Sequence, residues 1–86
     1  MKVKILSSTD IRGGGTPTTV EDAVYVRASF VSTGLAEVQV RDTQFGSAVQ
    51  RFNVPPYGNI IFKKETSQYV YGSTSGLYFC SVAPNP

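Results

Sequence analysis

Histidine and tryptophan are absent from the 86 residues, and cysteine occurs once, at Cys80. Without histidine, the Ser-His and Cys-His pairs that activate most protein nucleophiles cannot form, and no Ser-x-x-Lys stands in for them. A lone cysteine excludes an intrachain disulfide, and without histidine it argues against a zinc site. We therefore expect a protein that is not an enzyme and that holds no metal or other cofactor.

Charge and long apolar runs are also scarce. Charged residues make up 16% of the chain and the net charge is +2, with no basic run longer than Lys63-Lys64. We expect these two lysines to be solvated charges at a strand edge. No run approaches the ~20 apolar residues of a membrane span, and Lys4 interrupts the apolar start that a signal peptide would need. We expect no nucleic-acid or membrane partner.

Alternation of apolar and polar residues with a period of two is the main pattern, and it predicts β-strands. The alternating or apolar segments lie at residues 2–6, 24–30, 37–41, 50–54, 60–63, 68–71 and 77–82. No segment shows the spacing of an amphipathic helix, and residues 19–23 have room for one turn only. The sequence thus predicts a single all-β domain over 1–86, a small antiparallel β-sandwich or barrel of about seven strands.

The same pattern predicts the core and the connections. The expected core residues are Val24, Val26, Phe30, Val38, Val40, Phe52 and Val54. Ser32-Thr33-Gly34 and residues 72–76 are short polar connections, which we interpret as β-hairpins. The segment 77–82 is apolar on both faces, so we expect a central strand or a strand with one face against another chain. Cys80 lies within it and should be a buried, unreactive residue.

Residues 7–19 interrupt the regular pattern. This stretch is rich in Gly, Ser and Thr, and Ile11 is its only large apolar residue. Gly13-Gly14-Gly15 is not a phosphate-binding loop, because no Lys and no helix follow it. Asp10, Glu21 and Asp22 lack the spacing of a calcium loop. We expect a long loop or arm that lies on a neighbouring chain, since small domains without disulfides often gain stability from a partner.

Tyrosine is the residue type that best marks a binding surface here. The chain has five tyrosines, and Tyr69 and Tyr71 fall on one face of a predicted strand, with Tyr25 and Tyr78 as suggested cross-strand neighbours. Tyrosine is common at interfaces and equally common as ordinary sheet packing. The candidate interface residues are Ile11, Arg12, Tyr57, Tyr69, Tyr71 and Tyr78.

The second half of the chain resembles a known family. An apolar strand, the turn Pro55-Pro56-Tyr57-Gly58, and a strand that ends in Lys63-Lys64-Glu65-Thr66 are followed by Val70-Tyr71-Gly72-Ser73 and by Ser81-Val82-Ala83-Pro84. This order resembles small virion structural proteins of tailed bacteriophages. The likeness covers residues 52–84, extends loosely to Lys2–Leu6 and the Thr-rich loop, and rests on turn and strand chemistry alone.

The resemblance implies a β-sandwich with no catalytic residues. On that basis we expect a virion protein, made in the host cytoplasm, that decorates or cements the capsid shell and contacts capsid or other virion protein and copies of itself. A neck, tail or fibre-attachment module is the alternative within the virion. A free carbohydrate- or peptide-binding β-sandwich is the alternative from another class, and a lone binding module of that kind could remain monomeric.

Overall fold

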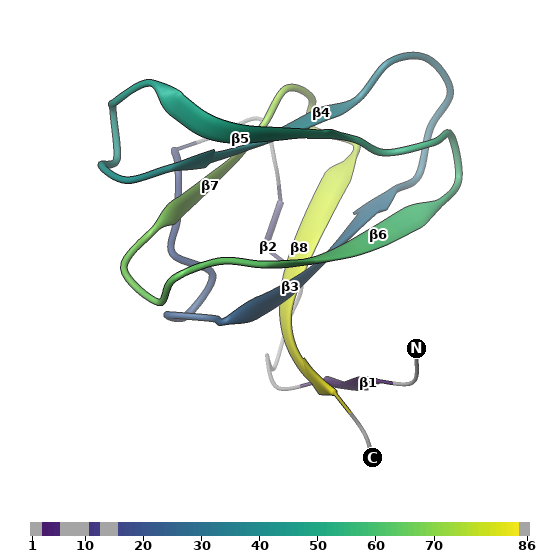
Figure 1. The fold of residues 1–86 in the computed structure, drawn as a ribbon. Coiled ribbons are helices and arrows are strands. Elements are labelled where there is room, and N and C mark those ends of the chain that lie inside the picture. The colour runs from purple at the N-terminus through teal and green to yellow at the C-terminus, as the bar shows by residue number, and fades with distance from the viewer. Residues whose placement is uncertain (1–2, 6–10, 13–15, 85–86) are drawn as a thin grey trace.

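The chain forms an all-β sandwich without helices among the described residues (Figure 1). The computed structural model describes residues 3–5, 11–12 and 16–84, with side chains described from 16 to 83. Its strands are β1 (Val3–Ile5), β2 (Ile11–Arg12), β3 (Tyr25–Phe30), β4 (Glu37–Arg41), β5 (Ala48–Asn53), β6 (Asn59–Lys63), β7 (Tyr69–Gly72) and β8 (Leu77–Pro84). The predicted all-β sandwich is confirmed, with two very short strands among the eight.

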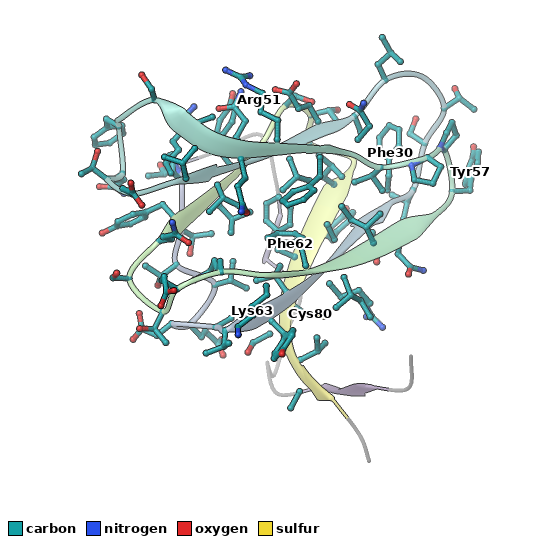
Figure 2. The ribbon with its side chains drawn as sticks, viewed as in Figure 1. Phe30, Arg51, Tyr57, Phe62, Lys63 and Cys80 are labelled. Atoms are coloured by element: carbon teal, nitrogen blue, oxygen red, sulfur yellow. The ribbon has the colours of Figure 1, made fainter. Side chains whose placement is uncertain are left out.

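Two antiparallel sheets make up the sandwich. The first, here called sheet A, has the order β1-β8-β3-β6, with β2 also paired to β8. The second, sheet B, has the order β5-β4-β7. Side chains of each sheet alternate between an inner face, against the other sheet, and an outer face. Figure 2 shows Phe62 of β6 pointing between the sheets, whereas Lys63 beside it points away from them.

The inner faces form one hydrophobic core. Of the predicted core residues, Val26, Phe30, Val38, Val40 and Val54 are buried, and Phe52 packs against them while partly exposed. The Phe52 and Phe62 rings stack with centroids 5.0 Å apart and join the two sheets. Further buried residues that the prediction did not name include Val20, Phe62, Val70, Leu77 and Phe79.

Val24 is the exception among the predicted core residues. It is 40% exposed, because β3 begins one residue later, at Tyr25. Its carbonyl accepts a hydrogen bond from the Lys64 backbone N–H, 2.8 Å away, so Val24 ends the ladder rather than filling the core.

The two predicted hairpins are wrong. The connection at Ser32-Thr33-Gly34 leads from β3 in sheet A to β4 in sheet B, and residues 72–76 lead from β7 in sheet B to β8 in sheet A. The chain also changes sheet between β5 and β6 and between β6 and β7. Among the connections from β3 onward, the hairpin is β4–β5, which has a β-bulge between Val40 and Arg41.

Parts of the expected long loop at residues 7–19 pair with strands of the sandwich. Ile11 and Arg12 form β2, which pairs with Phe79 and Tyr78 of β8 in the same chain. Thr18 forms an isolated bridge to Val70, with the two residues exchanging backbone hydrogen bonds of 3.1 and 2.6 Å. Residues 6–10 and 13–15 of the segment lie outside the described residues. The described part of the segment therefore contacts its own domain.

Residues 19–23 form a tight turn in which three consecutive residues have left-handed φ angles. The φ angles of Val20, Glu21 and Asp22 are 55°, 57° and 57°. The N–H of Ala23 donates to the carbonyl of Thr19, and the Thr19 hydroxyl accepts from the N–H of Asp22. Left-handed turns cost L-residues about 1–2 kcal/mol each. Burial of Val20, which has no exposed surface, offsets part of that cost.

Strand β8 is central in sheet A, as its two apolar faces predicted. It lies between β3 on one side and β1 and β2 on the other. Leu77 and Phe79 point into the core. Cys80 and Val82 alternate with them, and both are at most 2% exposed. Cys80 is therefore buried as predicted, but on the outer face of the sheet (Figure 2). Arg27 of β3 is its partner in the sheet register.

The prediction that Lys63 and Lys64 are both solvated is correct for Lys63 and wrong for Lys64. Lys63 is exposed at the end of β6, but Lys64 is only 4% exposed. Its Nζ donates to the carbonyls of Glu65 and Thr66, at 3.0 and 3.4 Å. Burial lowers the pKa of Lys64, and the nearby charge of Asp22 opposes that shift.

Candidate protein-binding surface

Three loops meet at one end of the sandwich. They are the sheet-crossing connections at residues 31–36, 54–58 and 73–76. Val54 N–H donates to the Ala36 carbonyl at 3.1 Å, and Val31 N–H donates to the Gly76 carbonyl at 3.1 Å. Backbone hydrogen bonds thus hold the first loop against each of the other two, so this end of the molecule is preorganised.

The turn of the second loop holds Tyr57 outward. Gly58 N–H donates to the Pro55 carbonyl at 3.0 Å, which closes a β-turn with Tyr57 in its third position. Tyr57 has a φ of 53°, a conformation that glycine or asparagine normally supplies in a type II turn. Figure 2 shows the Tyr57 side chain beyond the end of β6, and it is 73% exposed. The turn accepts local strain and displays an aromatic ring in solvent.

Two further exposed apolar side chains lie in the first of these loops. Leu35 is 99% exposed and Val31 is 56% exposed. A hollow of about 300 Å³ lies between the loops, and its lining includes Leu35, Ala36, Val54, Pro55 and Pro56. We call Val31, Leu35, Pro55, Pro56 and Tyr57, together with this hollow, the loop-end surface. It offers both apolar projections and an apolar depression.

Charge is absent from the three loops. Residues 31–36, 54–58 and 73–76 contain no Asp, Glu, Lys or Arg. Interface centres are depleted in charge and enriched in aromatic residues. Exposed apolar groups gathered in one place are a common mark of a protein-binding site, whereas scattered ones are ordinary.

The predicted interface residues do not come together. Tyr57 lies on the loop-end surface, Tyr69 and Tyr71 lie on the outer face of sheet B, and Tyr78 lies on the outer face of sheet A. Ile11 and Arg12 form β2, and their side chains are outside the described residues. Tyr25 and Tyr78 are not cross-strand neighbours of Tyr69 and Tyr71, because they belong to the other sheet.

On the outer face of sheet B, polar side chains form hydrogen bonds with one another. Gln39 and Arg51 both donate to Glu37 Oε1 at 2.9 Å, and Arg41 donates to Gln39 Oε1. The Arg41 guanidinium also covers the Tyr71 ring at 4.6 Å. The hydrogen bond from Gln39, reinforced by Arg51, lowers the pKa of Glu37. Since these groups already satisfy one another, this face resembles a solvated surface more than a binding site.

Within residues 16–83, no three His, Cys, Asp or Glu residues gather closely enough to hold a metal ion. No helix long and apolar enough to cross a membrane occurs in the described ranges.

Sequence reasoning identified Tyr57 and missed Val31 and Leu35. Both missed residues lie in a connection between strands, where alternation gives no information about exposure. The usable signal was composition, because two large apolar residues in a short connection that should be polar are unusual.

Comparisons with protein-family models, with curated proteins and with solved structures found no match to this chain. The chain's fold and its loop-end surface therefore stand as the basis for a functional hypothesis.

Proposed function

We propose that this chain is a non-enzymatic structural module of a tailed-bacteriophage virion, and that it decorates or cements the capsid shell. The observation that carries the proposal is the loop-end surface. It is apolar, uncharged and held by backbone hydrogen bonds, and it displays Leu35 and Tyr57 to solvent.

Docking of this surface would bury the apolar side chains that the isolated domain leaves in water. Each fully buried large apolar side chain contributes about 1.5–3 kcal/mol. Because the loops are already tied together, little conformational entropy is lost on binding. A protein that binds only the assembled shell stabilises it by mass action.

The family resemblance and the surface share residues. The turn Pro55-Pro56-Tyr57-Gly58 belongs to the stretch that resembles small virion proteins, and it is the turn that projects Tyr57. This overlap supports the proposal that the shared turn serves assembly.

The test is incorporation into virions. A phage lacking the gene for this chain is grown in hosts that supply wild type or the Leu35→Ser/Tyr57→Asn double variant. Asparagine tolerates the positive φ of residue 57, so the variant should fold. We expect the number of copies per particle, measured by quantitative mass spectrometry, to fall at least about tenfold, because buried anchors contribute 1 kcal/mol or more each.

The control is Val49→Ser, which removes an exposed apolar side chain from edge strand β5 of sheet B, outside the loop-end surface. It should incorporate normally. Cryo-electron microscopy of the same particles locates the protein. Density on the shell supports decoration, density at the neck or tail supports the alternative module, and absence from purified particles overturns the virion proposal.

A further inference from the structure

The free edges of the two sheets differ in how they are protected. The edge of β7 is bridged by Thr18, and the edge of β5 is interrupted by the bulge beside Val49. Strand β6 pairs with β3 over its whole length, from Asn59 to Lys63, and ends sheet A on that side. Unprotected edges invite pairing with another strand.

The alternation of hydrogen bonds shows which groups of β6 remain unused. At one end, Phe30 N–H donates to the Gly58 carbonyl at 2.9 Å, and at the other, Lys64 N–H donates to the Val24 carbonyl at 2.8 Å. Antiparallel ladders alternate, so Ile60 and Phe62 bond to β3. The backbone N–H and C=O groups of Asn59, Ile61 and Lys63 point away from β3, along the free edge.

We propose that β6 pairs with β6 of a second copy of this chain, antiparallel and centred on Ile61. This pairing would join two sheets A into one sheet through a two-fold axis. It involves a surface distinct from the loop-end surface and does not depend on the proposed virion function.

The side chains favour this register and this partner. With Ile61 at the axis, Ile61 meets Ile61 of the second copy, and Asn59 meets Lys63 on the outer face. On the inner face, Ile60 meets Phe62. Every apolar residue opposes an apolar one, no like charges oppose, and such cross-strand pairs stabilise sheets. Shifting the axis to Ile60 or Phe62 sets Ile61 against Asn59 or Lys63, which is less favourable.

The proposed pairing also limits assembly to two copies. A two-fold contact uses the same edge on both copies, so it produces a dimer and no fibre. A single edge buries less surface than a standard stable interface. We therefore expect a monomer–dimer equilibrium that depends on concentration.

Sedimentation equilibrium of the full chain, from about 1 µM to about 1 mM, tests the dimer, and charge variants test the register. Asn59→Lys should weaken the dimer at least tenfold, because the new lysine of each copy then faces Lys63 of the other, which makes two like-charge pairs. Adding Lys63→Glu should restore the affinity. Within one chain these two positions are four residues apart along a strand, so the rescue requires two copies. Val49→Lys adds the same charge on β5 and should leave the dimer unchanged.

A covalent test gives an independent measurement. Residues in a hydrogen-bonded antiparallel pair have Cα atoms about 5.5 Å apart, which suits a disulfide. In a Cys80→Ser background, Ile61→Cys should form disulfide-linked dimers on mild oxidation, whereas Lys63→Cys should not. A wild-type chain that stays monomeric throughout, or a dimer that Asn59→Lys does not weaken, overturns the proposal.

Discussion

At the scale of single residues, the molecule places its backbone strain in two turns. Val20, Glu21, Asp22 and Tyr57 are non-glycine residues with positive φ. Strain of this kind persists only where surrounding contacts hold it. For Val20 the contact is the core itself. For Tyr57, which is largely exposed, the turn and the proline residues beside it hold the backbone.

The left-handed turn predicts a stabilising substitution. Glu21 is exposed, so Glu21→Gly should lose few contacts while it removes the strain of a positive φ, about 1–2 kcal/mol. Glycine has more conformational freedom in the unfolded chain, and this lowers the free energy of unfolding by about 0.5–1 kcal/mol. We expect a net gain of about 1 kcal/mol in the free energy of unfolding, measured by urea denaturation.

Glu65→Gly is the matched control for this prediction. Glu65 is exposed as well but has no positive φ, so glycine there should destabilise the protein. A loss of stability in both variants would mean that Glu21 is not strained.

Lys64 predicts a dependence of stability on pH. Its pKa is lowered in the folded protein, mainly by burial. Between that lowered value and the ordinary lysine pKa, the unfolded chain binds more protons, so stability rises with pH across this interval. The variant Lys64→Met carries no buried charge. Below the folded pKa it should therefore equal or exceed the wild type in stability, as replaced buried charges often do.

The measurement is urea denaturation of both proteins at neutral pH and near pH 10. The comparison with Lys64→Met isolates the contribution of Lys64, because the two proteins share every other ionisable group. We expect the wild type to gain stability relative to the variant as the pH rises. A relative loss would show that Lys64 is stabilised in its charged form.

At the scale of elements, the strand positions could be predicted but most of their partners could not. Alternation reports which residues share a face, and it located each strand from β3 to β8 within about two residues. A Gly- and Ser-rich connection such as 72–76 favours a change of direction. It does not distinguish a hairpin within one sheet from a crossing to the other, because both need the same turn residues.

The short elements and the candidate surface escaped prediction for related reasons. A two-residue strand such as β2 has no periodicity to detect. Exposure of Leu35 depends on where three distant loops meet, and this is decided by the sheet order. Tyr57 was identified as an interface candidate, but its positive φ follows from the turn that Gly58 closes, which tertiary structure determines.

We expect the bridge between Thr18 and Val70 to protect the free edge of β7. Thr18→Pro removes the N–H that donates to the Val70 carbonyl at 3.1 Å, because proline has no amide proton. Loss of this hydrogen bond leaves the carbonyl of the buried residue Val70 unpaired, at a cost of about 1–3 kcal/mol. We expect a lower midpoint of thermal unfolding and faster aggregation by light scattering, since the β7 edge is then exposed.

Thr18→Ser preserves both the backbone N–H and the hydroxyl that accepts from Val20 N–H, and it should behave as the wild type. Equal stability of the proline variant would show that the bridge contributes nothing to the edge.

At the scale of the whole molecule, one core serves both sheets. Leu77 has no exposed surface and lies in the same buried cluster as Val20, Val38 and Phe79. Truncation of a buried leucine costs about 2–5 kcal/mol, a large part of the stability of a domain this small. We expect Leu77→Ala to lower the free energy of unfolding by about 3 kcal/mol.

Because the core is shared, both sheets should unfold together in this variant. Tyrosine fluorescence and far-ultraviolet circular dichroism should report the same urea midpoint. Two separate midpoints would show that one sheet persists without the other, contrary to a single core.

The central position of β8 has a consequence for the order of events during synthesis. Strand β8 joins β1 and β2 to β3, yet the ribosome makes it after the other strands. Until β8 emerges, β1 and β2 have no partner, and β3 pairs with β6 alone. In the nascent chain, β1, β2 and one edge of β3 therefore stay unpaired until β8 is made, and cooperative folding waits for this strand. Such non-local pairing also makes folding slow for a chain of this length.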